Sequence, residues 1–103
     1  MIINLTPHNL VLQLGDVTKT IASSGVARCQ QSGSYAGKID DVPLVTMAYG
    51  AVEGLPEPIE GTVFVVSALV RCAVPMRSDV ASPGDLVRDS LGAVVGCRNL
   101  VIN

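Results

Sequence analysis

The sequence predicts a mainly β protein, a compact β-barrel or β-sandwich of about seven or eight short strands with one short helix. Two observations support this prediction. Short runs of β-branched and aliphatic residues recur along the chain, and clusters of Gly, Pro, Asp and Ser separate these runs. The chain has 103 residues and no internal repeat, so we expect a single β-rich domain over residues 1–103.

The N-terminal part favours extended segments joined by tight turns. Residues 2–5 form a short apolar run that stops before Pro7, because proline lacks the amide hydrogen that a strand ladder needs. Residues 11–14 and 17–21 flank a Gly-Asp pair, which is the pattern of a β-hairpin. We therefore expect a strand, a turn and then a hairpin.

The next segment predicts two strands separated by a loop. Residues 26–32 alternate along a strand in a way that lets Arg28 point into a polar interior or pocket. Residues 33–41 have the composition of a turn and are expected to form the most mobile loop. Residues 42–49 resume the β pattern, with a proline near the start of the strand.

The C-terminal half begins with a rigid connection and ends in a hairpin. Two prolines in residues 54–58 exclude a helix or a central strand there. The β-branched run 62–67 is typical of a strand buried on both faces, and residues 68–74 favour a short helix, although a strand also suits them. Residues 86–89 and 93–102 predict the closing hairpin.

Composition limits the classes of function. Hydrophobic residues make up 49% of the chain and charged residues only 16%, so we expect surplus apolar surface and a homo-oligomer. The net charge of −2 does not favour binding to duplex nucleic acid. The N-terminus lacks the pattern of a secretion signal, and no apolar run is long enough for a membrane span.

The three cysteines have neither paired spacing nor nearby histidines. They predict reduced thiols in a cytoplasmic protein, and neither a zinc site nor another cofactor is expected. The chain also lacks a phosphate-binding glycine loop and a dinucleotide fingerprint.

His8 is the only histidine and lies beside Thr6 on the predicted proline turn. A lone histidine without metal partners is usually structural, so one interpretation is a surface or turn-stabilising residue. The other is a ligand contact or a general base, because an imidazole titrates near neutral pH and a rigid turn can aim it. Thr6 would then supply a hydroxyl beside the imidazole.

The densest charged segment spans residues 77–89, with a predicted turn at its Pro-Gly pair. Arg77 and Arg88 lie at its two ends, and Asp79, Asp85 and Asp89 are placed to orient them. Arginines held by carboxylates suit bidentate binding of a phosphate or pyrophosphate. Solvent-facing salt bridges of little energetic value are the alternative.

Two further residues are candidates for the site. Ser67 precedes the predicted helix and is expected to be its N-cap, although the backbone donors beside it would also attract an anion. Glu57, in the proline-rich connection, either faces a pocket or belongs to a plain rigid loop.

The chain resembles a family of small phage and prophage proteins. The motifs that carry the resemblance are Asn4-Leu-Thr-Pro-His8, Gly54-Leu-Pro-Glu-Pro58, Val65-Val-Ser67, Arg77-Ser-Asp79, Pro83-Gly-Asp-Leu-Val-Arg-Asp89 and Gly96-Cys97, spread over nearly the whole chain. Small β-rich phage oligomers include sponges that sequester nucleotide signals of bacterial immunity, such as cyclic oligonucleotides or ADP-ribose derivatives. The resemblance therefore implies an anti-defence protein in the cytoplasm of an infected or lysogenic bacterial host.

Three functions follow as expectations. The first is a binding protein that sequesters a small phosphate-bearing nucleotide signal in a pocket built by His8, Arg28, Arg77 and Arg88. The second is a metal-independent phosphodiesterase with His8 as general base and an arginine stabilising the developing charge. The third is a structural or interaction protein of a phage assembly, in which the apolar surplus forms an interface.

Overall fold

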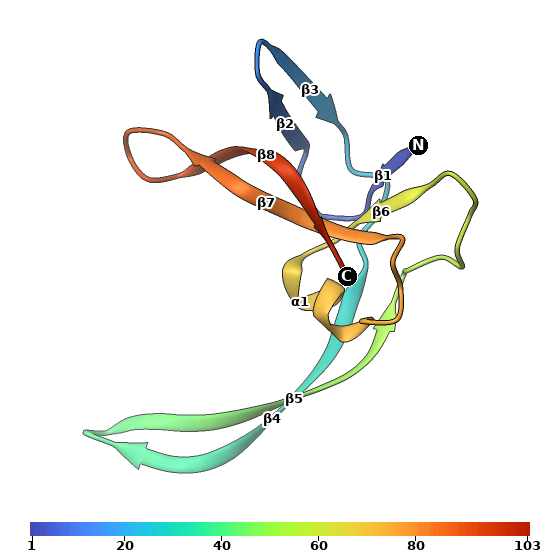
Figure 1. Cartoon of the computed structure of the whole chain (residues 1–103). Helices are drawn as coiled ribbons and strands as arrows, with labels where there is room; N and C mark the ends of the chain where they lie inside the picture. The colour runs from blue at the N-terminus through green and yellow to red at the C-terminus, as the bar shows by residue number, and fades with distance from the viewer.

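The computed structural model describes all 103 residues and contains eight strands and one short helix (Figure 1). The mainly β prediction is confirmed. The elements in chain order are β1 (Ile2–Asn4), β2 (Leu10–Leu14), β3 (Val17–Ile21), β4 (Arg28–Ile39), β5 (Val42–Glu53), β6 (Val63–Val65), α1 (Ala68–Ala73), β7 (Val80–Arg88) and β8 (Val94–Ile102).

Six strands form one sheet in the order β1-β6-β7-β8-β2-β3, and the sheet curls into a half-barrel (Figure 1). The β1–β6, β6–β7 and β2–β8 pairs are parallel, whereas β2–β3 and β7–β8 are antiparallel hairpin pairs. The remaining strands, β4 and β5, pair only with each other and project from the sheet as a long hairpin. The sheet with α1 is therefore the body of the molecule, and the hairpin is an arm.

The core lies on both faces of β6, as its continuous apolar sequence predicts. Phe64 and Val66 face one cluster, which also contains Leu5, Ala27, Cys29, Val70 and Val80. Val65 faces the other cluster with Leu10, Leu12 and Cys97. Successive side chains of a strand point to opposite faces, so this short strand joins the two clusters.

The predicted helix is confirmed and begins where the sequence indicates. The Ser67 hydroxyl oxygen accepts a hydrogen bond from the backbone N–H of Val70, at 3.3 Å. This is the N-cap interaction expected of serine, because it satisfies a backbone donor that the first helical turn leaves open.

The prediction of a turn at Pro83-Gly84 is wrong, because β7 runs through both residues. Parallel pairing of β7 with β6 ends at Ala81, so β7 has a neighbour on only one side at Pro83, and proline is tolerated as it is in an edge strand. Gly84 lies opposite Asn99 and beneath Val101, and a Cβ at Gly84 would approach Val101 Cγ2 to 2.7 Å. Close packing, and not a turn, requires this glycine.

The prediction of a loop over residues 33–41 is also wrong, since β4 continues to Ile39. The turn contains only Asp40 and Asp41, whose φ angles are 48° and 63°. A two-residue hairpin turn of this kind needs positive φ at both positions, and aspartate tolerates that region better than most residues. The glycines and serines of residues 33–41 therefore belong to a strand with small side chains.

Asn4 is a fully buried polar residue at the end of β1, and all its hydrogen-bonding groups are satisfied. Its side-chain amide donates to the carbonyl oxygens of His8 at 2.7 Å and Ile21 at 3.0 Å. Its Oδ1 accepts from the Thr6 backbone N–H at 3.0 Å and the Thr6 hydroxyl at 2.6 Å. One side chain thus fixes the turn after β1 and the end of β3.

We predict that Asn4→Leu, which keeps the branched shape and the number of heavy atoms of the side chain, lowers the free energy of unfolding by about 3 kcal/mol, because it leaves several polar groups without partners. Urea unfolding followed by circular dichroism measures the change. The control is Asn9→Ala, because Asn9 is an exposed asparagine in the same segment and should change stability by less than about 0.5 kcal/mol. Equal losses in the two variants would contradict the role given to Asn4.

Candidate functional site

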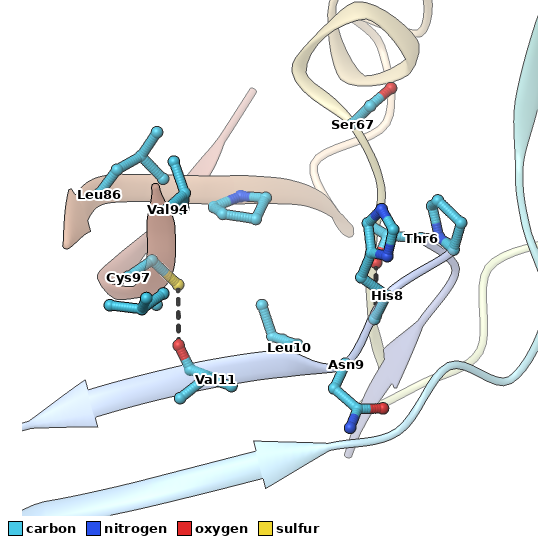
Figure 2. Close-up of a pocket in the computed structure, with 13 residues that line it drawn as sticks. Thr6, His8, Asn9, Leu10, Val11, Ser67, Leu86, Val94 and Cys97 are labelled. Atoms are coloured by element: carbon cyan, nitrogen blue, oxygen red, sulfur yellow. Dashed lines mark hydrogen bonds between the residues drawn. The ribbon is translucent and has the colours of Figure 1, made fainter. Parts of the chain in front are cut away.

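The largest hollow of the body has a volume of about 710 Å³ and lies between the Thr6–Asn9 turn and the β7–β8 hairpin (Figure 2). The turn stands at one end of this pocket, and the side chains of the hairpin stand at the other. Thirteen residues line it: Thr6, Pro7, His8, Asn9, Leu10, Val11, Ser67, Pro83, Leu86, Val94, Val95, Gly96 and Cys97. We call it the main pocket.

The hairpin end of the main pocket is apolar. Leu86 comes from β7, Val94 and Val95 come from β8, and Val11 of β2 lies across from them. Buried Cys97 lies within this wall, with Sγ 3.6 Å from the Val11 carbonyl oxygen. Burial raises the pKa of the Cys97 thiol, so the sulfur stays protonated and forms part of the wall.

The turn end of the main pocket is polar. The Thr6 hydroxyl is held by Asn4, and the Ser67 hydroxyl is held as the helix cap. The His8 backbone carbonyl accepts from Asn4, which fixes the turn, while the His8 side chain is exposed at the pocket rim (Figure 2). His8 is therefore an imidazole on a rigid support with its ring available to a ligand.

A second hollow of about 280 Å³ adjoins the main pocket and contains Arg28. Thr6, Pro7 and Ser67 line both hollows, so the turn and the helix start form their common wall. Arg28 forms no ion pair within the chain. Glu53, its partner across the β4–β5 ladder, instead accepts a hydrogen bond from Gln30 at 2.6 Å. Arg28 is thus a cation available to a ligand beside the turn.

Arg77 and Asp79 lie outside both hollows and bind each other. The guanidinium donates from Nε and Nη2 to the two carboxylate oxygens, at 2.8 Å each, and Nη2 also donates to the Pro56 carbonyl at 2.9 Å. The hydrogen bond from Arg77 lowers the pKa of Asp79, and the same bond raises the pKa of Arg77, with a smaller contribution from the charge of Glu57. This pair fastens the proline-rich connection to the start of β7.

Arg88, the last residue of β7, and Asp89, which follows it, stabilise the turn between β7 and β8. Arg88 Nη1 donates to the Gly92 carbonyl at 2.9 Å. Asp89 Oδ1 accepts from the backbone N–H groups of Leu91 at 2.9 Å and Ala93 at 3.0 Å. Both side chains thus act locally, and neither lines a hollow.

The structure brings together four of the residues predicted for the site, namely Thr6, His8, Arg28 and Ser67, around two adjoining hollows. It does not bring Glu57, Arg77, Asp79, Arg88 or Asp89 to these hollows. The apolar wall was missed by sequence reasoning, and no sequence pattern indicates it, because its residues in β2 and β8 are consecutive and do not alternate with polar ones.

The site is a half-open pocket with a polar rim on a small, β-rich chain. The residues His, Cys, Asp and Glu do not form any group of three or more that could hold a metal ion. All three cysteines are free: Cys29 and Cys97 are buried and Cys72 is exposed. The one helix, with six residues, is too short to cross a membrane.

Comparisons of the chain with protein-family models, with curated proteins and with solved structures found no match.

The Arg77–Asp79 pair predicts a specific pH dependence. Because the pKa of Asp79 is lower in the folded chain than in the unfolded chain, the pair stabilises the fold above about pH 4, and this contribution is lost as the pH falls through the folded pKa. Asp79→Asn should cost about 2 kcal/mol at pH 7, and the difference from the unmodified protein should shrink toward pH 2. Urea unfolding at several pH values measures it.

The control for this prediction is Glu60→Gln, which removes an exposed carboxylate that forms no ion pair. This variant should follow the unmodified protein across the whole pH range. A constant difference between Asp79→Asn and the unmodified protein down to pH 2 would show that the carboxylate charge is not what stabilises this region.

Proposed function

We propose that this protein is a non-enzymatic binding protein that sequesters a small phosphate-bearing nucleotide signal, a cyclic oligonucleotide or an ADP-ribose derivative. The proposal rests on the wall that the two hollows share at Thr6 and Ser67. On one side of this wall lies the apolar main pocket with His8, and on the other side lies the second hollow with Arg28. The base of the ligand occupies the main pocket, and its phosphate lies at the rim between His8 and Arg28.

The size and chemistry of the two hollows support this arrangement. A volume of about 710 Å³ falls within the range of small-molecule sites, and its apolar wall provides the contact that a planar base needs. Arg28 has five donors and no intramolecular carboxylate to satisfy them, so it suits bidentate binding of a phosphate. One arginine at the site, on a chain of net charge −2, fits a small anion better than a polymer.

Sequestration is favoured over cleavage by what surrounds His8. A phosphodiesterase with His8 as general base needs a second group to protonate the leaving oxygen. The other titratable residue lining the main pocket is Cys97, which is buried, and no carboxylate lines that pocket to orient the imidazole. The anti-defence role in a bacterial cytoplasm, which the resemblance to phage proteins implies, belongs to this same proposal.

The projecting hairpin favours a second candidate function, a structural subunit of a phage assembly. Apolar side chains such as Tyr35 and Val45 are exposed on both its strands. In that function the apolar side chains of the arm would contact other subunits. The main pocket would result from the curvature of the sheet and would bind no ligand.

We predict that at least one member of a probe panel of cyclic dinucleotides, cyclic trinucleotides, ADP-ribose and cyclic ADP-ribose raises the Tm by several degrees. His8→Gln and Arg28→Gln should each weaken that probe about tenfold or more in titration calorimetry, because each removes a group at the rim. The matched control is Arg98→Gln, since Arg98 is an exposed arginine of β8 that lines neither hollow.

The bound probe is then released by heat and analysed by chromatography. Intact probe supports sequestration, whereas a cleaved product that depends on His8 supports the phosphodiesterase. If no probe moves the Tm, the binding proposal fails and the assembly subunit becomes the better candidate.

A further inference from the structure

Almost all residues of the arm, which consists of β4 and β5, are exposed to solvent. Cys29, at its root, is the only buried residue in the two strands. Beyond the root the arm leaves the sheet and packs on no other element in Figure 1. An isolated two-stranded hairpin is marginally stable in water at best, so an arm of two 12-residue strands needs a further packing partner.

The two faces of the arm differ in chemistry. Cross-strand pairing places Gln31 opposite Tyr49, Gly33 opposite Met47 and Tyr35 opposite Val45, and these six residues share one face. We call this the tyrosine face.

The opposite face carries small and mostly polar side chains in the pairs Ser32–Ala48 and Ser34–Thr46. Toward the tip, the alternation along β5 places Leu44 and Val42 on this opposite face as well, and they are 43% and 57% exposed. Over the pairs from Gln31–Tyr49 to Tyr35–Val45 the arm is therefore amphipathic, with the large apolar side chains on the tyrosine face.

The apolar side chains of the tyrosine face are open to solvent. Their exposed fractions are 68% for Tyr35, 61% for Val45, 53% for Tyr49 and 43% for Met47. Gly33 contributes to the shape of the face, because Met47 Sδ lies 3.3 Å from where a Cβ of Gly33 would be. The thioether thus lies across the glycine, and the face is nearly continuous.

We propose that the tyrosine face is the interface through which this protein binds a second copy of itself. This inference is independent of the ligand proposed for the main pocket.

The surface area of the chain supports a partner of this kind. The single chain of 10.7 kDa exposes 6764 Å², whereas a folded monomer of that mass exposes about 5,500 Å². The surplus of roughly 1,200 Å² exceeds the area of about 800 Å² that each partner buries in a standard specific interface. The radius of gyration is 16.2 Å, whereas a compact domain of this length has about 13 Å, so the chain is also more extended than a typical monomer. The exposed area of the chain is therefore that expected of a subunit separated from its partner.

The charge pattern favours a copy of the same chain over a different partner. None of the six residues of the tyrosine face is charged, so nothing on it selects a partner of opposite charge. A copy related by twofold symmetry presents the same uncharged face and brings no like charges together. Self-association buries the tyrosines without burying an ion.

The tip of the arm argues against insertion into a membrane. The turn carries Asp40 and Asp41, and Lys38 is the only cation near them. An acidic tip is repelled by an anionic lipid surface and is costly to bury in the hydrocarbon region. The same charges can remain in water at the rim of a protein interface.

The experiment measures the mass of the full chain by sedimentation equilibrium between about 1 and 100 µM protein. We expect a reversible dimer or a higher oligomer. Tyr35→Thr and Val45→Thr should each raise its dissociation constant about tenfold or more, because threonine keeps the β propensity while reducing the apolar surface. The matched controls are Ser34→Thr and Ala48→Thr, which place the same residue on the opposite face and should leave the mass unchanged.

Amide hydrogen exchange of the unmodified protein gives a second readout that needs no variant. Exchange in residues 30–51 should slow as the protein concentration rises, because association protects the arm. A monomer at all concentrations would overturn the proposal, as would an oligomer that Tyr35→Thr and Val45→Thr leave intact. Exchange in the arm that is independent of concentration, or a monomer that sediments with phosphatidylcholine–phosphatidylglycerol vesicles, would also overturn it.

Discussion

The buried side chain of Asn4 is the interaction on which the arrangement of this molecule most depends. It lies where the chain leaves β1, and its four hydrogen bonds join that point to the turn at Thr6 and His8 and to the end of β3 at Ile21. Because the residue has no exposed surface, water cannot replace any of these bonds. The polar rim of the main pocket is therefore positioned from inside the core.

The arm starts from the same place. The backbone of Asn4 accepts a hydrogen bond from Ser24 at 2.8 Å, and the backbone of Leu5 accepts one from Ala27 at 3.0 Å, so the segment leading into β4 runs alongside β1. Arg28 follows immediately and thus stands at the root of the arm and beside the turn. One short stretch of backbone pairing sets the position of both the proposed phosphate site and the proposed interface.

Sequence patterns predicted what depends on local backbone preference. The helix capped by Ser67 is an example, because its geometry involves only neighbouring residues. Sequence patterns failed where a distant strand decides the conformation. Pro83 lies inside β7 because β6 ends early. The small residues after Ser32 form a strand because β5 pairs with them. The candidate site shows the same difference between local and distant interactions. Arg77 was expected to be oriented by a carboxylate, which it is, but the sequence does not reveal that Asp79 and Pro56 occupy its donors.

The distribution of aromatic residues links composition to the proposed assembly. The chain has one phenylalanine and two tyrosines, and Phe64 is completely buried at the centre of the core. Both tyrosines lie on the same face of the arm, where they are mostly exposed. Large aromatic side chains contribute most when they are buried, and tyrosine is enriched at protein interfaces because its hydroxyl can still reach a polar partner. A chain with so few aromatic residues places two of them where only association would bury them.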